Sequence, residues 1–219
     1  MVWEAGQDVG DASDLFTGVL FNEYGPPPGF CWDLPCDDEP LMDKDLFETN
    51  IKERADSLVS FITEQSAHYR TNHIIVTMGE DFQFQAAHSW FMNLDRMIQH
   101  INGRKEELKI NMFYSTPACY LNALHAAKLS WPTKQDDFMP YASDPHSYWS
   151  GYFTSRPSSK YMMRQAEQYS QIHDQLTVLL DQPTQSAESL HKAVAIVQHH
   201  DAITGTEKEH VASGYMGLW

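Results

Sequence analysis

The sequence has few basic residues. Its 219 residues include 15 Lys and Arg against 30 Asp and Glu, so the formal net charge at pH 7 is −15. Because a protein that binds nucleic acid needs a basic surface, this charge argues against a nucleic-acid partner. No apolar run approaches the roughly 20 residues of a transmembrane helix, so we expect no membrane span. Residues 1–8 have neither a basic start nor an apolar core, and no signal peptide is visible.

Cysteine is also scarce, with only Cys31, Cys36 and Cys119. Cys31 and Cys36 lie in a proline-bounded loop, where a small disulfide and two free thiols are both compatible with the spacing. The odd cysteine, Cys119, is either a buried thiol or has a partner outside this chain. No Asn-x-Ser/Thr sequon occurs, so glycosylation sites give no support to secretion.

The remaining composition is that of a globular protein, with 42% hydrophobic and 12% aromatic residues. In the first two thirds, helical and strand-like patterns alternate. Apolar spacing predicts helices over Phe47–Ile62 and Trp90–Ile101 and, behind a Thr-Pro cap signal, over Ala118–Lys128. Two short apolar runs, His73–Met78 and Leu108–Tyr114, are typical of strands. This alternation predicts an α/β domain with a parallel sheet.

After about Tyr141 the pattern becomes helical. Ser155 and Pro157 open a long helix, and the segment around Pro183 leads into a second helix that is predicted to end at His200. The apolar stripe of the first helix is Met162, Ala166, Tyr169, Leu176 and Leu180. The last third is therefore predicted to be a helix bundle beside the α/β part.

The second of these helices leads into a group of polar side chains. Continuing its apolar run, Leu190–Val197, by three or four residues reaches His200 and Asp201, which predicts that both face the core. Buried polar groups need a partner, and a metal ion or a bound ligand is one candidate. Since consecutive helical residues diverge by roughly 100°, His199, His200 and Asp201 can meet at one ion only where the helix breaks. Thr204–Thr206 favours such a break.

One histidine is then the expected metal ligand, with Asp201 free for another task. The sequence contains no His-Glu-x-x-His or Cys-x-x-Cys pattern, so the remaining ligands of any metal must come from elsewhere.

A pair of acidic residues follows the predicted strand His73–Met78. Glu80 and Asp81 would lie at the carboxyl end of that strand, where α/β proteins bind ligands. Phe82 offers an apolar wall that would raise the pKa of a neighbouring carboxyl group. Glycoside hydrolysis needs such a partly protonated acid at the leaving oxygen. The alternative, which is the commoner arrangement, is a solvated acidic pair at the start of the next helix.

A second acidic pair, Asp136-Asp137, precedes the aromatic cluster Tyr148–Phe153, which includes Trp149. Aromatic rings pack against the C–H faces of sugars, and Trp and Tyr combine a rigid apolar surface with a polar group. Packing at a domain interface is an equally compatible use of these rings. Both interpretations stay open at this point.

Seven segments, taken in order, resemble one known family. They are Tyr24–Pro27, Cys31–Asp33, Tyr69–His73, Met78–Phe84, Tyr114–Tyr120, Tyr148–Pro157 and Gln198–Ala202. These segments closely resemble the lysosomal branch of the α-mannosidases of glycoside hydrolase family 38. The resemblance covers nearly the whole chain, and the paired-histidine segment is highly specific.

The resemblance implies a retaining α-mannosidase with a covalent mannosyl-enzyme intermediate. Such an enzyme removes terminal α-D-mannose from N-glycan oligosaccharides during glycoprotein catabolism in the lysosome. Asp81 would be the general acid/base, and His200 would be a ligand of a Zn²⁺ ion that holds hydroxyls of the substrate. The substrate-binding residues implied are Tyr24, Trp149, His199 and Asp201.

The resemblance also implies a fold and partners. Residues 1–145 would be the C-terminal part of a seven-stranded, barrel-like, parallel-sheet α/β catalytic domain. Residues 146–219 would be the start of a three-helix bundle that carries the His-His-Asp motif. A Cys31–Cys36 disulfide is favoured, with Cys119 paired to an upstream cysteine. The partner expected first is the remainder of the same enzyme chain, and a homodimer is a further expectation.

The sequence departs from the family in one respect. The family's nucleophilic aspartate and its His-x-Asp zinc ligands lie in upstream blocks that this sequence does not contain. Because retaining hydrolysis needs two carboxylates roughly 5 Å apart, we expect no mannosidase activity from this chain alone. One alternative is a truncated, non-catalytic relative that acts as a scaffold or interaction module. An unrelated acidic metal-binding protein is a third interpretation, which the ordered resemblance disfavours.

Overall fold

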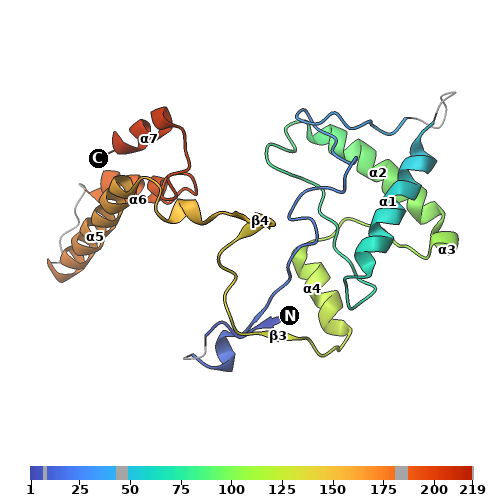
Figure 1. Ribbon diagram of the computed structural model, residues 1–219, viewed down its shortest axis with the longest axis horizontal. Helices are drawn as coiled ribbons and strands as arrows, with labels where there is room; N and C mark the ends of the chain where they lie inside the picture. Colours follow the sequence, from blue (N-terminus) through green and yellow to red (C-terminus); the bar gives the residue numbers. More distant parts are fainter. Residues whose placement is uncertain (7–8, 43–48, 181–186, 219) are drawn as a thin grey trace. The chain divides into compact units, whose positions relative to one another are not determined.

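The computed structural model describes residues 1–6, 9–42, 49–180 and 187–218. The chain divides into two compact units, residues 1–136 and 137–219, and each is described by itself (Figure 1). Phe47 in the first predicted helix and Pro183 in the predicted connection lie outside the described residues.

The first unit contains a small sheet of short strands. Strand β1 (Val2–Trp3) pairs antiparallel with β2 (Leu15–Phe16) and parallel with β3 (Thr133–Lys134), so the order is β2-β1-β3. A short 3-10 helix, η1 (Asp11–Ser13), separates β1 from β2. The sheet thus joins the first residues of the unit to its last, a long-range pairing that no local sequence pattern predicts.

The core of the first unit lies between α1 (Ile51–Ser66) and α2 (Ala87–Gly103). The apolar stripes predicted for these two helices are confirmed. Their buried members are Ala55, Leu58 and Ile62 of α1, with Trp90, Leu94, Met97 and Ile101 of α2. After the short helix α3 (Lys105–Leu108), helix α4 (Pro117–Ala126) begins where predicted. Its cap is the predicted one, because Thr116 Oγ1 accepts a hydrogen bond from the backbone N–H of Cys119 at 3.2 Å.

The segments His73–Met78 and Leu108–Tyr114 are not strands, which corrects the prediction made from their apolar residues. Alternate residues of each segment nevertheless pack against the α1–α2 core: Ile74, Val76 and Met78, and Leu108, Ile110 and Met112. The alternation of apolar residues in the two segments therefore indicated correctly which side chains face the core. A strand also needs a neighbouring backbone to pair with. The backbone of Met112 instead exchanges two hydrogen bonds with the side chain of Asn102, at 2.7 and 2.8 Å.

The second unit is mainly helical. In its described residues a β-hairpin comes first and helices follow, of which α5 and α6 pack together. Its elements in order are β4 (Ala142–Asp144), β5 (Ser147–Tyr148), η2 (Ser150–Phe153), α5 (Pro157–Leu180), α6 (Glu188–Val197) and α7 (Glu209–Met216). Met163, Val197 and Ala202 form its small core.

The apolar stripe predicted for α5 is only partly correct. Of its five members only Ala166 is buried, and the neighbouring Met163 is the larger buried side chain of the helix. Apolar residues occur on several sides of α5, so spacing alone did not select the face that packs. The fold class as a whole is mixed α/β with few strands. The complete seven-stranded sheet and the three-helix bundle stay predictions.

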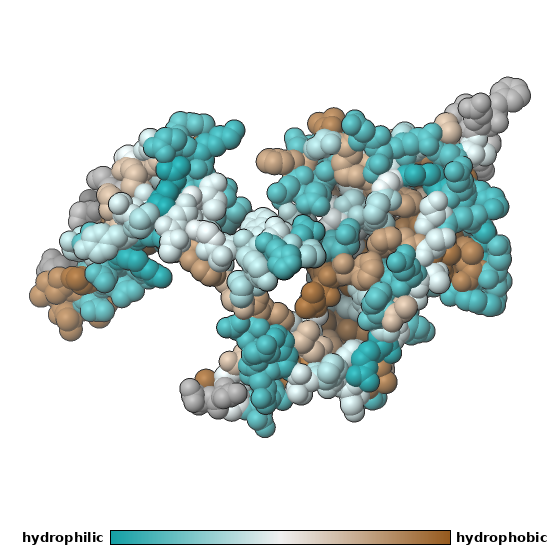
Figure 2. Space-filling model, viewed as in Figure 1, coloured by the Kyte–Doolittle hydropathy of each residue, from teal (hydrophilic) through white to brown (hydrophobic). Residues whose placement is uncertain are grey.

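The surface of both units carries hydrophobic residues, which Figure 2 shows in brown among hydrophilic ones. Large exposed hydrophobic side chains include Phe91 and Phe113 in the first unit, and Val178 and Leu179 near the end of α5 in the second. Among the described helices, none has the length and apolar character needed to cross a membrane.

Two methionines of α2 test the core. Met97 is fully buried, whereas Met92, five residues earlier in the same helix, is 54% exposed. We expect Met97→Ala to lower the free energy of unfolding by about 2–5 kcal/mol, because it removes buried methylenes and leaves a cavity. Met92→Ala should change it by less than about 0.5 kcal/mol. Urea unfolding followed by tryptophan fluorescence measures both, and equal effects of the two substitutions would contradict the assignment of the core.

Candidate functional site

The predicted acid, Asp81, lies in a loop of residues 79–86 between the segment His73–Met78 and α2; we call it the acid loop. The Tyr24 hydroxyl donates a hydrogen bond to Asp81 Oδ1 at 2.5 Å, and both residues are exposed. This hydrogen bond, followed by desolvation and the negative charges of Asp81 and Glu80, raises the pKa of Tyr24 to about 12. The Tyr24 hydroxyl therefore stays protonated at neutral and acidic pH and can donate its hydrogen bond to Asp81. The structure thus brings together two of the residues predicted for the site.

The turn that carries Tyr24 is fixed against the chain near the acid loop. Asn22 Nδ2 donates to Pro26 O at 2.8 Å, and Thr77 Oγ1 donates to Gly25 O at 2.7 Å. Gly25 is buried, and a Cβ atom there would lie 2.8 Å from Glu80 Oε2. The proline-rich turn and the acid loop therefore approach each other closely, and a glycine fits between them.

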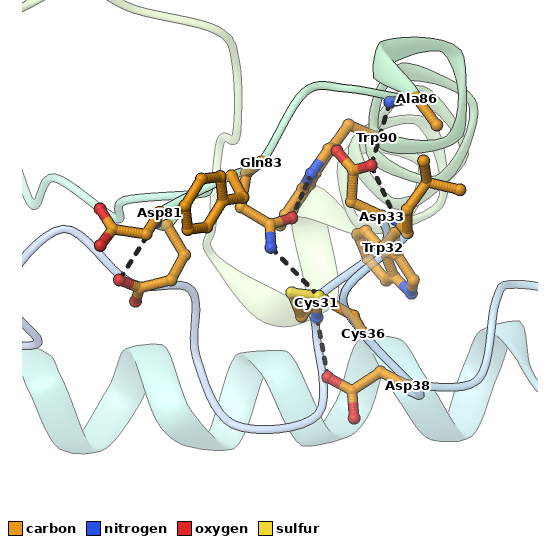
Figure 3. Close-up of a disulfide and its surroundings, with 12 residues drawn as sticks. Cys31, Trp32, Asp33, Cys36, Asp38, Asp81, Gln83, Ala86 and Trp90 are labelled. Carbon is orange, nitrogen blue, oxygen red and sulfur yellow. Dashed lines mark hydrogen bonds between the residues drawn. A yellow bond between two sulfur atoms is a disulfide. The ribbon is translucent and has the colours of Figure 1, made fainter. Parts of the chain in front are cut away.

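The loop of residues 30–38, closed by the Cys31–Cys36 disulfide, holds the acid loop from the other side; we call it the disulfide loop (Figure 3). Gln83 is the connecting side chain. Its Nε2 donates to Cys36 Sγ at 3.3 Å, and its Oε1 accepts from Trp90 Nε1 at 3.0 Å. The side chain of Gln83, which is two residues after Asp81, thereby links the disulfide to the buried indole of Trp90 in α2. The disulfide favoured by the resemblance is confirmed, and Cys119 is an exposed free thiol.

Asp33 makes a second connection between the two loops. Its Oδ1 accepts the backbone N–H of Leu34 at 2.7 Å, inside the disulfide loop, and of Ala86 at 3.0 Å, at the end of the acid loop. Burial acts to raise the pKa of Asp33, but these backbone donors outweigh it and hold the pKa below its usual value. The sequence analysis assigned no role to Asp33 or Gln83. An Asp beside Leu-Pro in a cysteine-bounded loop is a signal for a side chain that caps a turn.

The expected apolar wall beside Asp81 is absent, which corrects one step of the sequence analysis. Phe82 is 79% exposed, with a backbone φ of 60°. Phe84, which has a similar φ of 64°, instead stacks on Trp90 with ring centroids 5.4 Å apart. The hydrogen bond from Tyr24, rather than burial against Phe82, is the contact that the structure provides to Asp81.

The His-His-Asp motif follows directly after α6. The helix ends at Val197 rather than at His200, so the break comes before the motif and not at Thr204–Thr206, where it was expected. His199 Nε2 lies 3.4 Å and His200 Nε2 3.9 Å from Asp201 Oδ2, and one donor atom from each of the three lies within 4.8 Å of the others. The two imidazole rings are 4.3 Å apart. The break allows a convergence that a continuous helix would prevent.

The prediction that His200 and Asp201 continue the buried stripe of the helix is wrong. The side chain of His200 is 83% exposed and that of Asp201 is 44% exposed. Because the helix has already ended, the turn moves Ala202 into the core in their place. The three donor atoms are therefore accessible to a ligand from solvent.

Threonine side chains fix the turn that contains the motif. Thr206 Oγ1 donates to Asp201 Oδ1 at 3.1 Å, and the hydroxyl of Thr204 donates to the carbonyl of His200. One oxygen of Asp201 thus holds the turn while the other faces the two imidazoles. Gly205 closes the turn at a φ of +69°, and its carbonyl accepts a 2.7 Å hydrogen bond from Ser155 Oγ.

Trp149 lies next to the β4–β5 hairpin. Its ring packs edge-on against Tyr141 at 5.4 Å, and its indole N–H donates to Ser143 Oγ at 3.1 Å. Trp149 and Tyr141 are both exposed, so the pair presents an aromatic surface to solvent. Trp149 and the His-His-Asp motif belong to the second unit, and Tyr24 and Asp81 belong to the first.

Comparison with known families identifies both parts of the chain. Residues 1–144 match the glycosyl hydrolases family 38 N-terminal domain, and residues 147–219 match the alpha mannosidase middle domain. The chain belongs to glycosyl hydrolase family 38. This membership confirms the resemblance predicted from the seven segments.

Individual relatives of this family 38 chain show how much of the enzyme it represents. It is 46% identical over 225 aligned residues to the lysosomal alpha-mannosidase of Felis catus and 44% identical to that of Cavia porcellus. It is 41% identical over 222 residues to an alpha-mannosidase of Arabidopsis thaliana. Each alignment covers 98% of this chain but only 21–22% of the relative, so the chain spans about a fifth of the length of these relatives.

Gly205 offers a test of the turn that carries the motif. A Cβ atom at this position would lie 2.6 Å from the Ser155 carbonyl oxygen, in a backbone conformation that disfavours side chains. We expect Gly205→Ala to lower the free energy of unfolding by about 1–3 kcal/mol. The matched control is Gly214→Ala, because Gly214 lies inside α7 with open space around its Cβ, where alanine should stabilise by about 0.5–1 kcal/mol. Thermal unfolding distinguishes the two, and a loss at both positions would contradict the account.

Asp33 predicts a pH dependence of stability. Its pKa is lower in the folded chain than the ordinary value of 3.8, so its carboxylate stabilises the fold above that value. This contribution is lost as the pH falls through the folded pKa. We expect Asp33→Asn to lower the urea midpoint at pH 7, and the difference from the unaltered chain to shrink below about pH 4. Asp37→Asn, at an exposed position of the same loop, is the control. A difference for Asp33→Asn that stayed constant from pH 7 to pH 2 would rule out this role.

Proposed function

We propose that this chain is the part of a retaining α-mannosidase that supplies the general acid/base and one zinc ligand. The enzyme would remove terminal α-D-mannose from N-glycan oligosaccharides in the lysosome. The observation that carries the proposal is the position of Asp81: an exposed carboxylate on a loop anchored by Gln83 and Asp33 to a disulfide loop. Family membership supplies the class of reaction.

In the proposed mechanism Asp81 protonates the glycosidic oxygen as the bond to mannose breaks, and later removes a proton from the attacking water. Tyr24 keeps one carboxylate oxygen in place through its hydrogen bond, which directs the other toward the substrate. Retaining hydrolysis also needs a nucleophile about 5–5.5 Å from the acid. In the family that aspartate comes from an upstream block, so the present chain alone would not turn over substrate.

The His-His-Asp motif fits a zinc ion by its donor set, two imidazole nitrogens and a carboxylate oxygen within 4.8 Å. We propose His200 as the ligand from this chain, with Asp201 and His199 binding sugar hydroxyls. Such an ion would orient the hydroxyls of the bound mannose and help to distort its ring. The exposed Trp149–Tyr141 pair would provide an apolar platform for the C–H face of the sugar.

The exposed hydrophobic residues of both units support a further part of the proposal. A soluble protein rarely leaves large apolar patches uncovered. We propose that the remainder of the same enzyme chain covers them, as the length of the relatives suggests. A homodimer is a second arrangement that would cover part of this surface.

The role of Asp81 can be tested in a chimera in which this chain replaces the matching segment of the Felis catus enzyme. We expect the chimera to hydrolyse α-mannosides and Asp81→Asn to lower its kcat/KM on α-mannobiose about 10²–10⁴-fold. The loss should be much smaller on 2,4-dinitrophenyl α-mannoside, whose leaving group needs no proton. Glu80→Gln, which neutralises the adjacent carboxylate, is the matched control and should retain most activity on both substrates.

Three results would contradict the proposal. If Asp81→Asn lowers activity equally on both substrates, Asp81 is not the general acid. If the isolated 219-residue chain hydrolyses α-mannobiose, and Asp81→Asn abolishes that activity, the chain does not depend on an upstream nucleophile. A chimera that folds but has no activity would instead favour a non-catalytic relative of the family.

A further inference from the structure

A second group of possible metal ligands lies between two helices of the second unit. His173 and Asp174 are neighbours on α5, and His191 lies near the start of α6. Asp174 Oδ1 is 3.2 Å from His173 Nδ1 and 2.9 Å from His191 Nε2. The two imidazole rings meet edge-on, with centroids 5.8 Å apart. One carboxylate oxygen therefore stands between two imidazole nitrogens that come from different helices.

These distances suit a small divalent ion. Around a tetrahedral zinc with bonds of 2.0–2.1 Å, neighbouring donor atoms are roughly 3.3 Å apart. The two measured separations lie near this value, and the donor atoms of all three residues lie within 4.8 Å of one another. Two imidazoles and a carboxylate favour zinc or a similar transition-metal ion over calcium and magnesium, which prefer oxygen ligands alone.

The surroundings leave room for the ion and for water. The three side chains line an open hollow of about 580 Å³, together with Glu188 and Lys192. Lys192 Nζ pairs with Glu188 Oε1 at 2.6 Å, so the charge of this lysine is neutralised by its own helix neighbour. The remaining coordination position would belong to water, as in sites with three protein ligands.

We propose that His173, Asp174 and His191 bind a divalent transition-metal ion, with zinc the best match, and that the ion ties α5 to α6. The same three residues already converge through hydrogen bonds, so the ion enters a group that is largely prearranged. On metal binding each imidazole turns a nitrogen lone pair toward the ion and carries its proton on the other ring nitrogen.

This site is separate from the His-His-Asp motif at the other end of α6. His191 lies six residues before the end of α6 at Val197, which corresponds to roughly 9 Å along the helix, and the motif follows beyond that end. A single ion therefore cannot take ligands from both groups. The inference is also independent of the proposed mannosidase activity, because it concerns the packing of two helices.

The test measures zinc binding by the chain after substitution of the exposed thiol and of the other His-Asp cluster found among the described residues. A background variant carries Cys119→Ser, His199→Gln and His200→Gln, which eliminates the exposed thiol and the motif. Titration calorimetry with zinc chloride should give one site per chain. Adding His191→Gln should weaken it at least about tenfold. His210→Gln on the exposed side of α7 is the matched control and should leave the isotherm unchanged. A background variant that binds no zinc, or equal binding with His191→Gln, would overturn the proposal.

A second measurement needs no substitution and does not depend on the folding of a variant. Diethyl pyrocarbonate modifies exposed imidazoles, and peptide mass spectrometry reports each histidine of the unaltered chain. Zinc should protect His173 and His191 and leave His210 equally reactive. Equal modification of His191 with and without zinc would contradict the site.

Discussion

The position of Asp81 depends on the contacts that the buried Trp90 makes with the two loops. The indole is fully buried and lies against Trp32 of the disulfide loop and Phe84 of the acid loop, with ring centroids 5.8 and 5.4 Å away. Its N–H also binds Gln83. A single side chain of α2 thus contacts both loops. The acid loop contains two residues, Phe82 and Phe84, with positive φ, a conformation that costs a bulky residue about 1–3 kcal/mol. Stacking of Phe84 on Trp90 offsets part of that cost.

In the second unit, the turn with the His-His-Asp motif is held by a different constraint, the close approach of two backbone segments. The backbone at Gly205 lies so close to the backbone of Ser155 that no side chain fits between them. Two charged side chains, from Lys160 and Arg156, also bind the segment around Gly205. Lys160 Nζ donates to the carbonyls of Ser155 and Ile203 at 2.6 and 2.8 Å. Arg156 binds Glu207 and Glu209. These contacts fix the turn that carries the His-His-Asp motif to the start of α5. The backbone of the motif is therefore held in place although its imidazole rings are exposed.

The parts of the structure that the sequence predicted are those with local causes. Period-3.6 spacing identified α1 and α2 and their buried faces, and the Thr116 cap identified the start of α4. The segment His73–Met78 alternates as a strand should, but pairing is a long-range property that its own residues do not contain. The short strands β1 and β3 were missed for the same reason, since each is defined only by its partner.

The site shows the same division between local and long-range causes. The sequence indicated that His199, His200 and Asp201 can meet only where the helix breaks, but it placed the break after them and predicted that His200 and Asp201 are buried. The helix ends at Val197, before the motif, and this earlier end also ends the buried stripe. The support of Asp81 by Gln83 and Asp33 joins residues about fifty positions apart, which no local pattern records. The motif resemblance proposes Asp81 as the acid, but it does not indicate the contacts that hold Asp81 in place.

The two histidine clusters of the second unit illustrate how a helix can present several ligands at one point. Adjacent helical residues diverge by roughly 100°, so neighbours in sequence do not converge on an ion by themselves. At His199–Asp201 this limit does not apply, because α6 ends before the motif and the three residues do not follow helical geometry. At His173 and Asp174 the helix continues, and convergence depends on His191 from the packed α6. The first arrangement places its three side chains on an exposed turn, whereas the second places them where α5 and α6 pack together. The geometry therefore separates a position suited to chemistry on a substrate from one suited to holding structure.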